Sequence, residues 1–207
     1  MKTKFTFVLS LLSFIFVNMK KIAIFASGNG TNAETIIKYF DKNNDVTVSR
    51  VFCNRENAFV LTRAKNLDIP VLIFDRKTFY ESDKVLNQLK KDNTDLIVLA
   101  GFLWLIPDNI LKNYRNRILN IHPALLPKYG GKGMYGSKVH EAVINAGEKE
   151  SGITVHFVNE KYDEGEIVFQ AKCRVDKNDT PDSLAGKIHK LEHKHYPEVI
   201  EKVLMAL

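Results

Sequence analysis

Asn120 and His122 have the residue types and the spacing to act together on one atom. They flank Ile121 in the segment Asn-Ile-His-Pro, and side chains two apart on a β-strand project from the same face. An amide N–H can stabilise an oxyanion, and an imidazole can move a proton near neutral pH. The pair predicts a catalytic centre at a strand end, although the motif alone could also hold a structural histidine.

Asp163 could complete this pair. It lies in the loop 162–165, which follows the alternating segment Thr154–Val158 and could reach the same crevice. A carboxylate beside an imidazole favours the protonated ring, so we expect Asp163 to hold His122 in its charged form. An isolated Asp-x-Gly is usually a surface turn, and only the combination with the histidine motif indicates a role in catalysis.

The segment 27–32, Ser-Gly-Asn-Gly-Thr-Asn, joins the first predicted strand to the first predicted helix. Backbone N–H groups in such a turn, with the positive end of the helix, can bind a phosphate. The segment lacks the third glycine of a dinucleotide fingerprint and the Gly-Lys-Ser/Thr of a P-loop, which argues against NAD and ATP. An ordinary turn capped by Thr31 or Asn32 is the alternative.

The remaining histidines carry weaker signals. His140 and His189 lie in predicted helices without a partner motif, and we expect them to be surface or partly buried residues. His156 alternates with apolar neighbours in a predicted strand and could face the crevice, although a structural role is the simpler interpretation.

A metal site is not expected. Glu192 and His195 are three residues apart in a predicted helix, but no third or fourth ligand accompanies them. Cys53 and Cys173 form no Cys-x-x-Cys pair, so we expect neither a zinc site nor a disulfide, and both thiols reduced and buried.

These residues need a scaffold, and from Lys21 onward short β-branched runs alternate with amphipathic helical stretches. That alternation predicts an α/β fold with a mostly parallel, doubly wound sheet. The predicted strands are Lys21–Ala26, Val46–Cys53, Val71–Phe74, Asp95–Ala100 and Ile118–Ile121, and the predicted helices are Asn32–Phe40, Ala58–Asn66 and Ser82–Lys91. Since such sheets bind ligands beyond the carboxyl ends of their strands, the loops after the first, fourth and fifth strands should meet at one crevice.

The pattern changes after Pro123. A Gly-rich loop precedes a predicted helix near Ser137–Asn145, and the alternating runs Gly152–Val158 and Glu166–Arg174 indicate late antiparallel or mixed strands. Thr180-Pro181 begins a carboxyl-terminal helix, which we expect Pro197 to kink or divide.

Size and charge limit the classes of partner. With 207 residues, 45% of them hydrophobic, the chain has the size of one domain. The net charge of +6 favours anionic partners mildly, and no run of five like charges is present. We expect small-molecule substrates, no nucleic acid, and a monomer or homodimer.

Residues 5–17 are hydrophobic, follow two lysines and are typical of the core of a secretory signal. They are too short to span a membrane, no small-x-small cleavage site follows, and Met19 begins a chain that would be complete without them. We interpret residues 1–18 as an amino-terminal extension from an upstream start or misassigned initiator, residues 19–207 as the functional domain, and the protein as cytoplasmic, with no stable membrane association.

Taken together, these motifs resemble those of the phosphoribosylglycinamide formyltransferase family from about Lys20 to Val203. The markers are 27–32, Ala100-Gly101-Phe102, 120–129, 154–158, Asp163 with Gly165, and Glu192-His193 before Tyr196-Pro197. The resemblance implies a Rossmann-like formyltransferase fold, 10-formyltetrahydrofolate as cosubstrate rather than a nicotinamide, phosphoribosylglycinamide as acceptor, and a place in purine biosynthesis.

The resemblance also implies roles for individual residues. Asn120, His122 and Asp163 would be catalytic. Substrate-binding residues for the acceptor would be Gly30, Thr31, Asn32, Glu192, His193, Lys194 and His195, and the formyl folate would contact Leu103, Trp104, Leu105, Ile106, Asn120, Asn159, Glu160, Lys161, Tyr162 and Asp163.

The sequence departs from the family pattern at three places. Trp104 stands where a basic or smaller residue is expected, Ser82 where an arginine often contacts folate, and the loop 130–136 is longer than usual. Another folate-dependent formyltransferase, a formyltetrahydrofolate hydrolase and a non-catalytic phosphate- or folate-binding module are the alternatives. Length argues against a transferase with an added tRNA-binding domain or a hydrolase with a leading regulatory domain.

Overall fold

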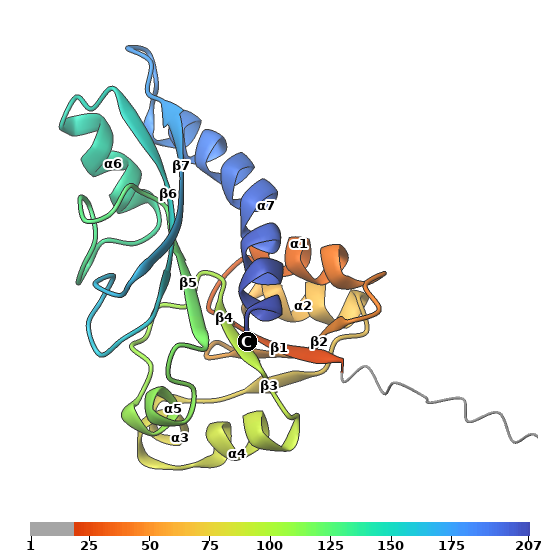
Figure 1. Cartoon of the computed structure of the whole chain (residues 1–207). Helices are drawn as coiled ribbons and strands as arrows, with labels where there is room; N and C mark the ends of the chain where they lie inside the picture. The colour runs from red at the N-terminus through yellow and green to blue at the C-terminus, as the bar shows by residue number, and fades with distance from the viewer. Residues whose placement is uncertain (1–18) are drawn as a thin grey trace, which may run out of the picture.

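Seven strands form one sheet with helices on both faces in the computed structural model, which describes residues 19–207 (Figure 1). The strands are β1 (Lys20–Ala26), β2 (Val46–Cys53), β3 (Val71–Ile73), β4 (Leu96–Leu99), β5 (Ile118–His122), β6 (Glu150–Phe157) and β7 (Ile167–Arg174). The helices are α1 (Thr31–Phe40), α2 (Phe59–Asn66), α3 (Arg76–Glu81), α4 (Lys84–Lys91), α5 (Asp108–Asn113), α6 (Ser137–Asn145) and α7 (Pro181–Met205). The interpretation of residues 1–18 lies outside the described residues.

The strand order places a ligand-binding crevice at the centre of the sheet. The order is β3-β2-β1-β4-β5-β6-β7. The first five strands are parallel, β6 pairs antiparallel with β5, and β7 pairs antiparallel with β6. The chain runs outward from β1 to β3 and then returns to the other side of β1, so the connections diverge between β1 and β4. At such a position, called a topological switch point, the loops that leave the carboxyl ends of the two strands run in opposite directions and leave room for a ligand between them. The predicted doubly wound fold with late antiparallel strands is confirmed.

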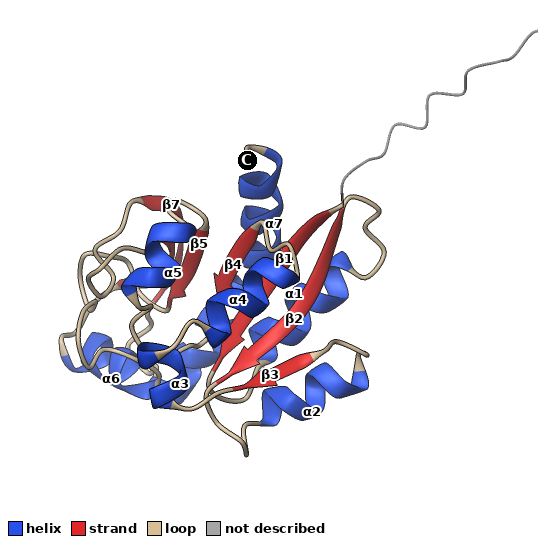
Figure 2. Cartoon of the chain, turned by 90° about the horizontal axis from the view of Figure 1, so that it is seen from below, coloured by secondary structure: helices blue, strands red, loops and turns tan. Residues whose placement is uncertain are grey.

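Successive side chains of the central strands point to opposite faces of the sheet and so form two separate hydrophobic cores. In β1, Ile22 and Ile24 pack with α1, α2 and α7, whereas Ala23 and Phe25 face α3, α4 and α5. Figure 2 shows α3, α4 and α5 in front of the sheet and α1, α2 and α7 behind it. Strands buried on both faces require near-continuous apolar sequence, which explains why these strands were predictable within one or two residues.

Two short helices were not predicted. α3 and α5 have six residues each, too few for a helical period to show in the sequence. α3 is identified by its cap instead, because the Asp75 carboxylate accepts a hydrogen bond from the backbone N–H of Thr78. α5 follows Pro107, and its single fully buried side chain is Ile110.

The carboxyl-terminal helix corrects one expectation. Thr180 caps α7 through a reciprocal capping box with Ser183, as its hydroxyl predicted. Pro197 does not divide the helix, which continues to Met205. Pro197 is buried with Tyr196, whose hydroxyl donates to the carbonyl oxygens of Leu99 and Leu119, so tertiary packing holds this part of α7 against the sheet.

The two cysteines differ in burial, and the helices are those of a chain without a spanning helix in its described part. Cys53 is buried as expected, but Cys173, on the less exposed face of the edge strand β7, is only partly buried; both thiols are free. Among residues 19–207, no helix is long and apolar enough to cross a membrane.

Candidate active site

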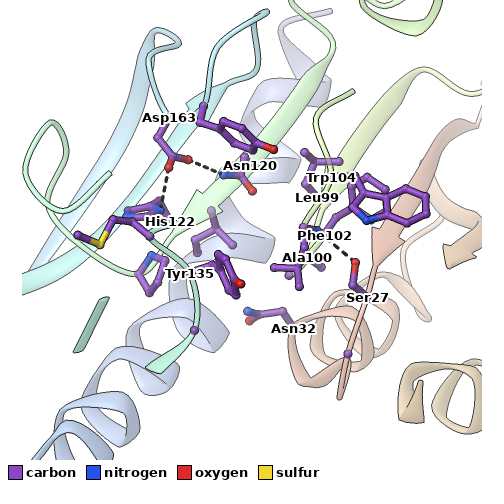
Figure 3. Close-up of a pocket in the computed structure, with 18 of the residues that line it drawn as sticks. Ser27, Asn32, Leu99, Ala100, Phe102, Trp104, Asn120, His122, Tyr135 and Asp163 are labelled. Carbon is purple, nitrogen blue, oxygen red and sulfur yellow. Dashed lines mark hydrogen bonds and ion pairs between the residues drawn. The ribbon is translucent and has the colours of Figure 1, made fainter. Parts of the chain in front are cut away.

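A cavity of about 690 Å³ opens at the carboxyl ends of β1, β4 and β5, where the strand order predicts it (Figure 3). Its walls come from segments far apart in the chain. They are the turn 27–32, the segment 99–106, residues 120–123 and the loop 131–136. Further lining residues come from the loop between β2 and α2, from α6, β6 and α7, and from the loop between β6 and β7. The three predicted loops therefore meet at one crevice.

Ser27 ties two of these loops together. Its hydroxyl accepts a hydrogen bond from the backbone N–H of Leu103 at 3.1 Å, and its own N–H donates to the carbonyl of Gly101 at 3.1 Å. Ser27 is 1% exposed, so both contacts are shielded from water. The loop after β1 and the loop after β4 are thus held together as one wall of the cavity.

Asn120, His122 and Asp163 converge at the floor of this cavity (Figure 3). The Nδ2 of Asn120 lies 3.4 Å from Oδ1 of Asp163, and the Nδ1 of His122 lies 3.5 Å from Oδ2 of the same carboxylate. His122 is 3% exposed and the Asp163 side chain 11%. The predicted spatial association of the three residues is confirmed, while their catalytic roles stay a prediction.

The protonation of His122 differs from the sequence-based expectation. Burial lowers its pKa from the ordinary 6.5, and this effect outweighs the nearby Asp163 carboxylate and the Tyr129 carbonyl, both of which raise it. The His122 ring is therefore neutral at pH 7 without substrate. Its Nε2 faces the Tyr129 carbonyl at 2.8 Å; since a carbonyl can only accept, the proton is on Nε2 and the lone pair on Nδ1 faces Asp163.

The carboxylate of Asp163 remains ionised. Burial alone would raise its pKa, but the neighbouring His156 and His122 rings and the backbone N–H of Gly131 together lower it below the ordinary 3.8. Gly131 N–H donates to Oδ2 at 2.9 Å. Asp163 adopts φ of 57°, a left-handed conformation in which short Asp side chains are enriched.

His156 belongs to the site, which the sequence left open. Its Nδ1 lies 2.8 Å from the Phe157 carbonyl, so Nδ1 carries the proton and Nε2 accepts from the Asn120 amide at 3.1 Å. Nε2 also lies 3.5 Å from Oδ1 of Asp163. The antiparallel pairing of β5 with β6 sets Asn120 opposite His156. This contact fixes which end of the Asn120 amide is the nitrogen.

The turn 27–32 forms the opposite end of the cavity. Gly30, not Thr31 or Asn32, caps α1, in a left-handed conformation with φ of 80° and no side-chain hydrogen bond. A Cβ at Gly30 would meet Val60 at 2.5 Å, so glycine is required by both conformation and space. The amino-terminal end of α1 thereby opens onto the cavity, as a phosphate-binding turn requires.

Glu192 reaches this end of the cavity from α7. The Asn32 Nδ2 donates to its Oε2 at 2.9 Å, while the buried Oδ1 of Asn32 has no protein partner. Burial raises the pKa of Glu192 more than the Asn32 hydrogen bond lowers it. His193, Lys194 and His195 are not among the cavity-lining residues, although the resemblance assigns them to the acceptor site.

The wall predicted for folate is formed in part. Of the residues predicted to contact folate, those that line the cavity are Leu103, Trp104, Leu105, Ile106, Asn120, Lys161, Tyr162 and Asp163. Asn159 and Glu160 do not line it, and Val158, which was not predicted, does. Trp104 packs against Phe102, Phe74 and Phe79, and the Arg76 guanidinium lies 5.7 Å above its ring. Ser82 is not part of the cavity wall.

Several lining residues were not predicted. They are Arg55, His140, His189 and the loop residues Gly131, Lys132, Gly133, Met134, Tyr135 and Gly136. His140 was expected at the surface or partly buried, but it is 4% exposed, and its Nδ1 is buried without a partner. No group of three or more His, Cys, Asp or Glu residues within 19–207 is arranged to hold a metal ion.

Comparisons with known proteins agree with this site. A family model described as formyl transferase matches residues 20–200. The chain is 39% identical to phosphoribosylglycinamide formyltransferase of Bacillus subtilis (strain 168), covering 90% of this chain and 95% of the relative. It is 43% identical to the chloroplastic protein of that name from Arabidopsis thaliana, covering 87% of this chain but only 64% of the relative.

Solved structures show the same similarity. Phosphoribosylglycinamide formyltransferase from Bacillus halodurans superposes with a TM-score of 0.81 at 38% identity, covering 89% of this chain and 95% of that one. Glycinamide ribonucleotide transformylase 1 from Symbiobacterium toebii gives a TM-score of 0.83 at 34% identity, covering 91% and 89%.

Proposed function

This chain belongs to the formyl transferase family, and on that premise we propose that it transfers the formyl group of 10-formyltetrahydrofolate to the amine of 5'-phosphoribosylglycinamide. The reaction is a step of de novo purine biosynthesis. The names of its relatives from Bacillus subtilis and Arabidopsis thaliana support this acceptor.

One observation carries the proposal. The Asn120, His122 and Asp163 side chains meet within 3.5 Å at the floor of a cavity whose far end is the glycine-capped amino terminus of α1. The first feature suits a developing oxyanion and a moving proton, and the second suits a phosphate. An acceptor with a phosphate at one end and an amine at the other fits between them.

The reaction requires charge stabilisation at one oxygen. The acceptor amine attacks the formyl carbon, and negative charge develops on the formyl oxygen. The Asn120 amide donates to this oxygen, and its nitrogen is held in place because His156 accepts its other N–H. Collapse of the tetrahedral intermediate breaks the bond between the formyl carbon and N10 of the folate.

The proton follows a separate route. The attacking amine must lose one proton, and N10 must gain one. The Nδ1 lone pair of neutral His122 accepts the proton directly or through one water, and Asp163 at 3.5 Å stabilises the resulting imidazolium. The ring then returns the proton to N10, so His122 is charged only in mid-reaction, and that charge also stabilises the oxyanion.

Turnover assays test the proposal against its alternatives. The purified protein is incubated with 10-formyltetrahydrofolate, with and without phosphoribosylglycinamide, and release of tetrahydrofolate is followed spectrophotometrically. Acceptor-dependent release with formation of the formylated product is expected. Acceptor-independent release would indicate a hydrolase, release only with a different amine would indicate another formyltransferase, and no release would indicate a binding module.

Other expectations extend this proposal. The protein acts on small molecules without nucleic acid or a resident metal, as a monomer or homodimer, in the cytoplasm. Light scattering during gel filtration measures the oligomeric state, and cell fractionation measures the location. Activity after dialysis against a chelator tests the independence from metal.

A further inference from the structure

Tyr129 contacts His122 from outside the cavity. Its backbone carbonyl lies 2.8 Å from Nε2 of His122, yet Tyr129 is not among the cavity-lining residues. The carbonyl can only accept a hydrogen bond, and at 2.8 Å it is closer to the ring than the Asp163 carboxylate at 3.5 Å, so this contact favours the proton on Nε2. The lone pair is consequently presented by Nδ1 on the side of Asp163.

The backbone that presents this carbonyl is in an uncommon conformation. Tyr129 has φ of 57°, in the left-handed region that bulky L-residues rarely adopt. Such a conformation persists only where surrounding contacts enforce it. The side chain supplies one: the Tyr129 hydroxyl donates to Oε1 of Glu148 at 2.9 Å, and the ring packs against the core that includes β5 and β6.

Glu148 is well placed to act as an anchor. It lies between the end of α6 and the start of β6, and Lys128 Nζ also donates to its Oε1 at 2.9 Å. The hydrogen bonds from Lys128 and Tyr129 lower the pKa of Glu148, so the carboxylate is ionised and a strong acceptor at neutral pH. The Glu148 side chain is about one quarter exposed and lies outside the cavity wall.

The same turn also contacts Asp163. Two residues after Tyr129, the N–H of Gly131 donates to Oδ2 of Asp163 at 2.9 Å. Gly130, between them, is packed so closely that a Cβ there would meet Leu126 at 2.5 Å and Asp163 at 3.2 Å. The three-residue turn 129–131 thus provides an acceptor to one member of the His122–Asp163 pair and a donor to the other.

We propose that Tyr129 and Glu148 are positioning residues: the Glu148 carboxylate holds the Tyr129 hydroxyl, and the Tyr129 carbonyl then fixes the tautomer and ring orientation of His122 for proton transfer. The assignment rests on the proposed function for its kinetic consequence. The tautomer itself is a property of the folded protein and is measurable without turnover.

Other charged and titratable groups near His122 also affect its pKa. Asp163 faces Nδ1 from the β6–β7 loop, and His156 from β6 lowers the pKa of His122. His140 from α6 is close enough for the charge of His122 to lower its own pKa. Neither the Tyr129 hydroxyl nor the Glu148 carboxylate contacts His156 or His140, so a change in His122 after either substitution reports the turn 129–131, through its carbonyl on His122 and its N–H on Asp163.

Two variants remove the anchor, and two serve as controls. Tyr129→Phe deletes the hydroxyl and keeps the ring, and Glu148→Ala deletes the acceptor. Glu148→Gln retains an oxygen that can accept from Tyr129, so it should restore the wild-type behaviour. Lys128→Ala removes the other partner of Glu148 without touching Tyr129, and should leave the tautomer of His122 and the rate unchanged.

The direct measurement is the ¹⁵N chemical shifts of the His122 ring in unliganded protein. The wild type, Glu148→Gln and Lys128→Ala should show a single Nε2–H tautomer, whereas Tyr129→Phe and Glu148→Ala should show a mixture. In turnover assays the last two should lose roughly five- to tenfold in kcat, as for one hydrogen bond, with KM for both substrates within about twofold.

The pH profile separates positioning from general damage. Loss of the carbonyl contact removes an interaction that raises the pKa of His122, so the acid limb of kcat should move to lower pH while the plateau falls. A single Nε2–H tautomer in both Tyr129→Phe and Glu148→Ala would overturn the proposal, whatever the activity. If the tautomer changes in both variants but the wild-type protein shows no turnover, the positioning proposal holds and only the proposed function is refuted.

Discussion

The Nδ1 of His122 lies 3.5 Å from Oδ2 of Asp163, although the two residues come from β5 and from the loop beyond β6. The separation is longer than a hydrogen bond and short enough for strong coupling of charge. A neutral imidazole facing an ionised carboxylate across this gap is a proton acceptor whose charged form is already compensated. Catalysis should therefore depend on the charge of Asp163 as well as on the ring of His122.

Replacing Asp163 with asparagine tests that dependence. Asp163→Asn keeps the size of the side chain but removes the charge that stabilises imidazolium, so kcat should fall by about 100-fold or more. KM for phosphoribosylglycinamide should stay within about twofold, since the amino terminus of α1 is untouched. Steady-state kinetics and acceptor binding by calorimetry measure both, and turnover within threefold of wild type would contradict the role.

His122→Ala should behave similarly, losing most turnover while still binding the acceptor. The alanine variant lacks the only ring whose Nδ1 faces Asp163 in the described structure. Addition of free imidazole should restore part of the rate, because the deleted ring leaves space beside the carboxylate. A variant that binds neither substrate would point to a structural role for this buried histidine.

Asn120 is expected to act on the oxyanion rather than on the proton. Asn120→Ala removes one donor and should cost about 100- to 1,000-fold in kcat, the usual loss for an oxyanion-hole donor. The acid limb of the pH profile should hold its position, unlike that of Asp163→Asn. Asn109→Ala removes an amide that bonds Asp83 and lines no part of the cavity; it is the matched control and should retain full activity.

The parts of the site that could be predicted are those carried by strands. Asn120 and His122 share a face because of strand geometry, and the loops after β1, β4 and β5 meet because parallel strands end at one edge. His140 could not be placed in the same way. It lies on a short helix after an irregular loop, and its burial depends on how α6 packs against α7. The sequence also predicts the wrong protonation state for His122, because it shows the Asp163 that raises the pKa of the ring and not the burial that lowers it further.

Gly30 should tolerate no side chain. Gly30→Ala would place a Cβ 2.5 Å from Val60 and force alanine into a φ of 80°, at a cost of at least about 1 kcal/mol from the backbone alone. The displaced turn should raise KM for the acceptor more than tenfold and leave KM for the folate within about twofold. Gly186→Ala, at an exposed position of α7 outside the cavity wall where nothing lies within 4 Å of the added Cβ, is the control; equal effects in both variants would argue against a specific phosphate-binding turn.

Acid should destabilise the folded protein through its buried histidines. Burial lowers the pKa of His140 below 6.5, with smaller effects of His189 and His122 in the same direction. The unfolded state then binds the proton first, so the contribution of His140 is constant above pH 6.5 and becomes destabilising as pH falls toward the folded-state pKa. His122 acts in the same sense, whereas the raised pKa of Glu192 opposes it.

The variant His140→Asn isolates that contribution. Urea unfolding between pH 7 and pH 5 should give a shallower loss of stability than in the wild type, by up to about 1.4 kcal/mol per pH unit for one proton. Parallel curves for the two proteins would show that His140 titrates alike in the folded and unfolded states.

Trp104 should affect the folate and not the acceptor. It lines the cavity beside Leu103 and Ile106, while its other face packs into the cluster of Phe74, Phe79 and Phe102. An indole in that position offers a flat apolar surface against which a pteridine ring could stack, in place of the basic or smaller residue expected there. Trp104→Ala should raise KM for 10-formyltetrahydrofolate roughly tenfold and keep KM for phosphoribosylglycinamide within about twofold. Trp104→Phe should recover most of the loss, because it restores an aromatic face against the same cluster. If Trp104→Ala instead lowered the unfolding midpoint and left the folate KM unchanged, the residue would serve the core alone.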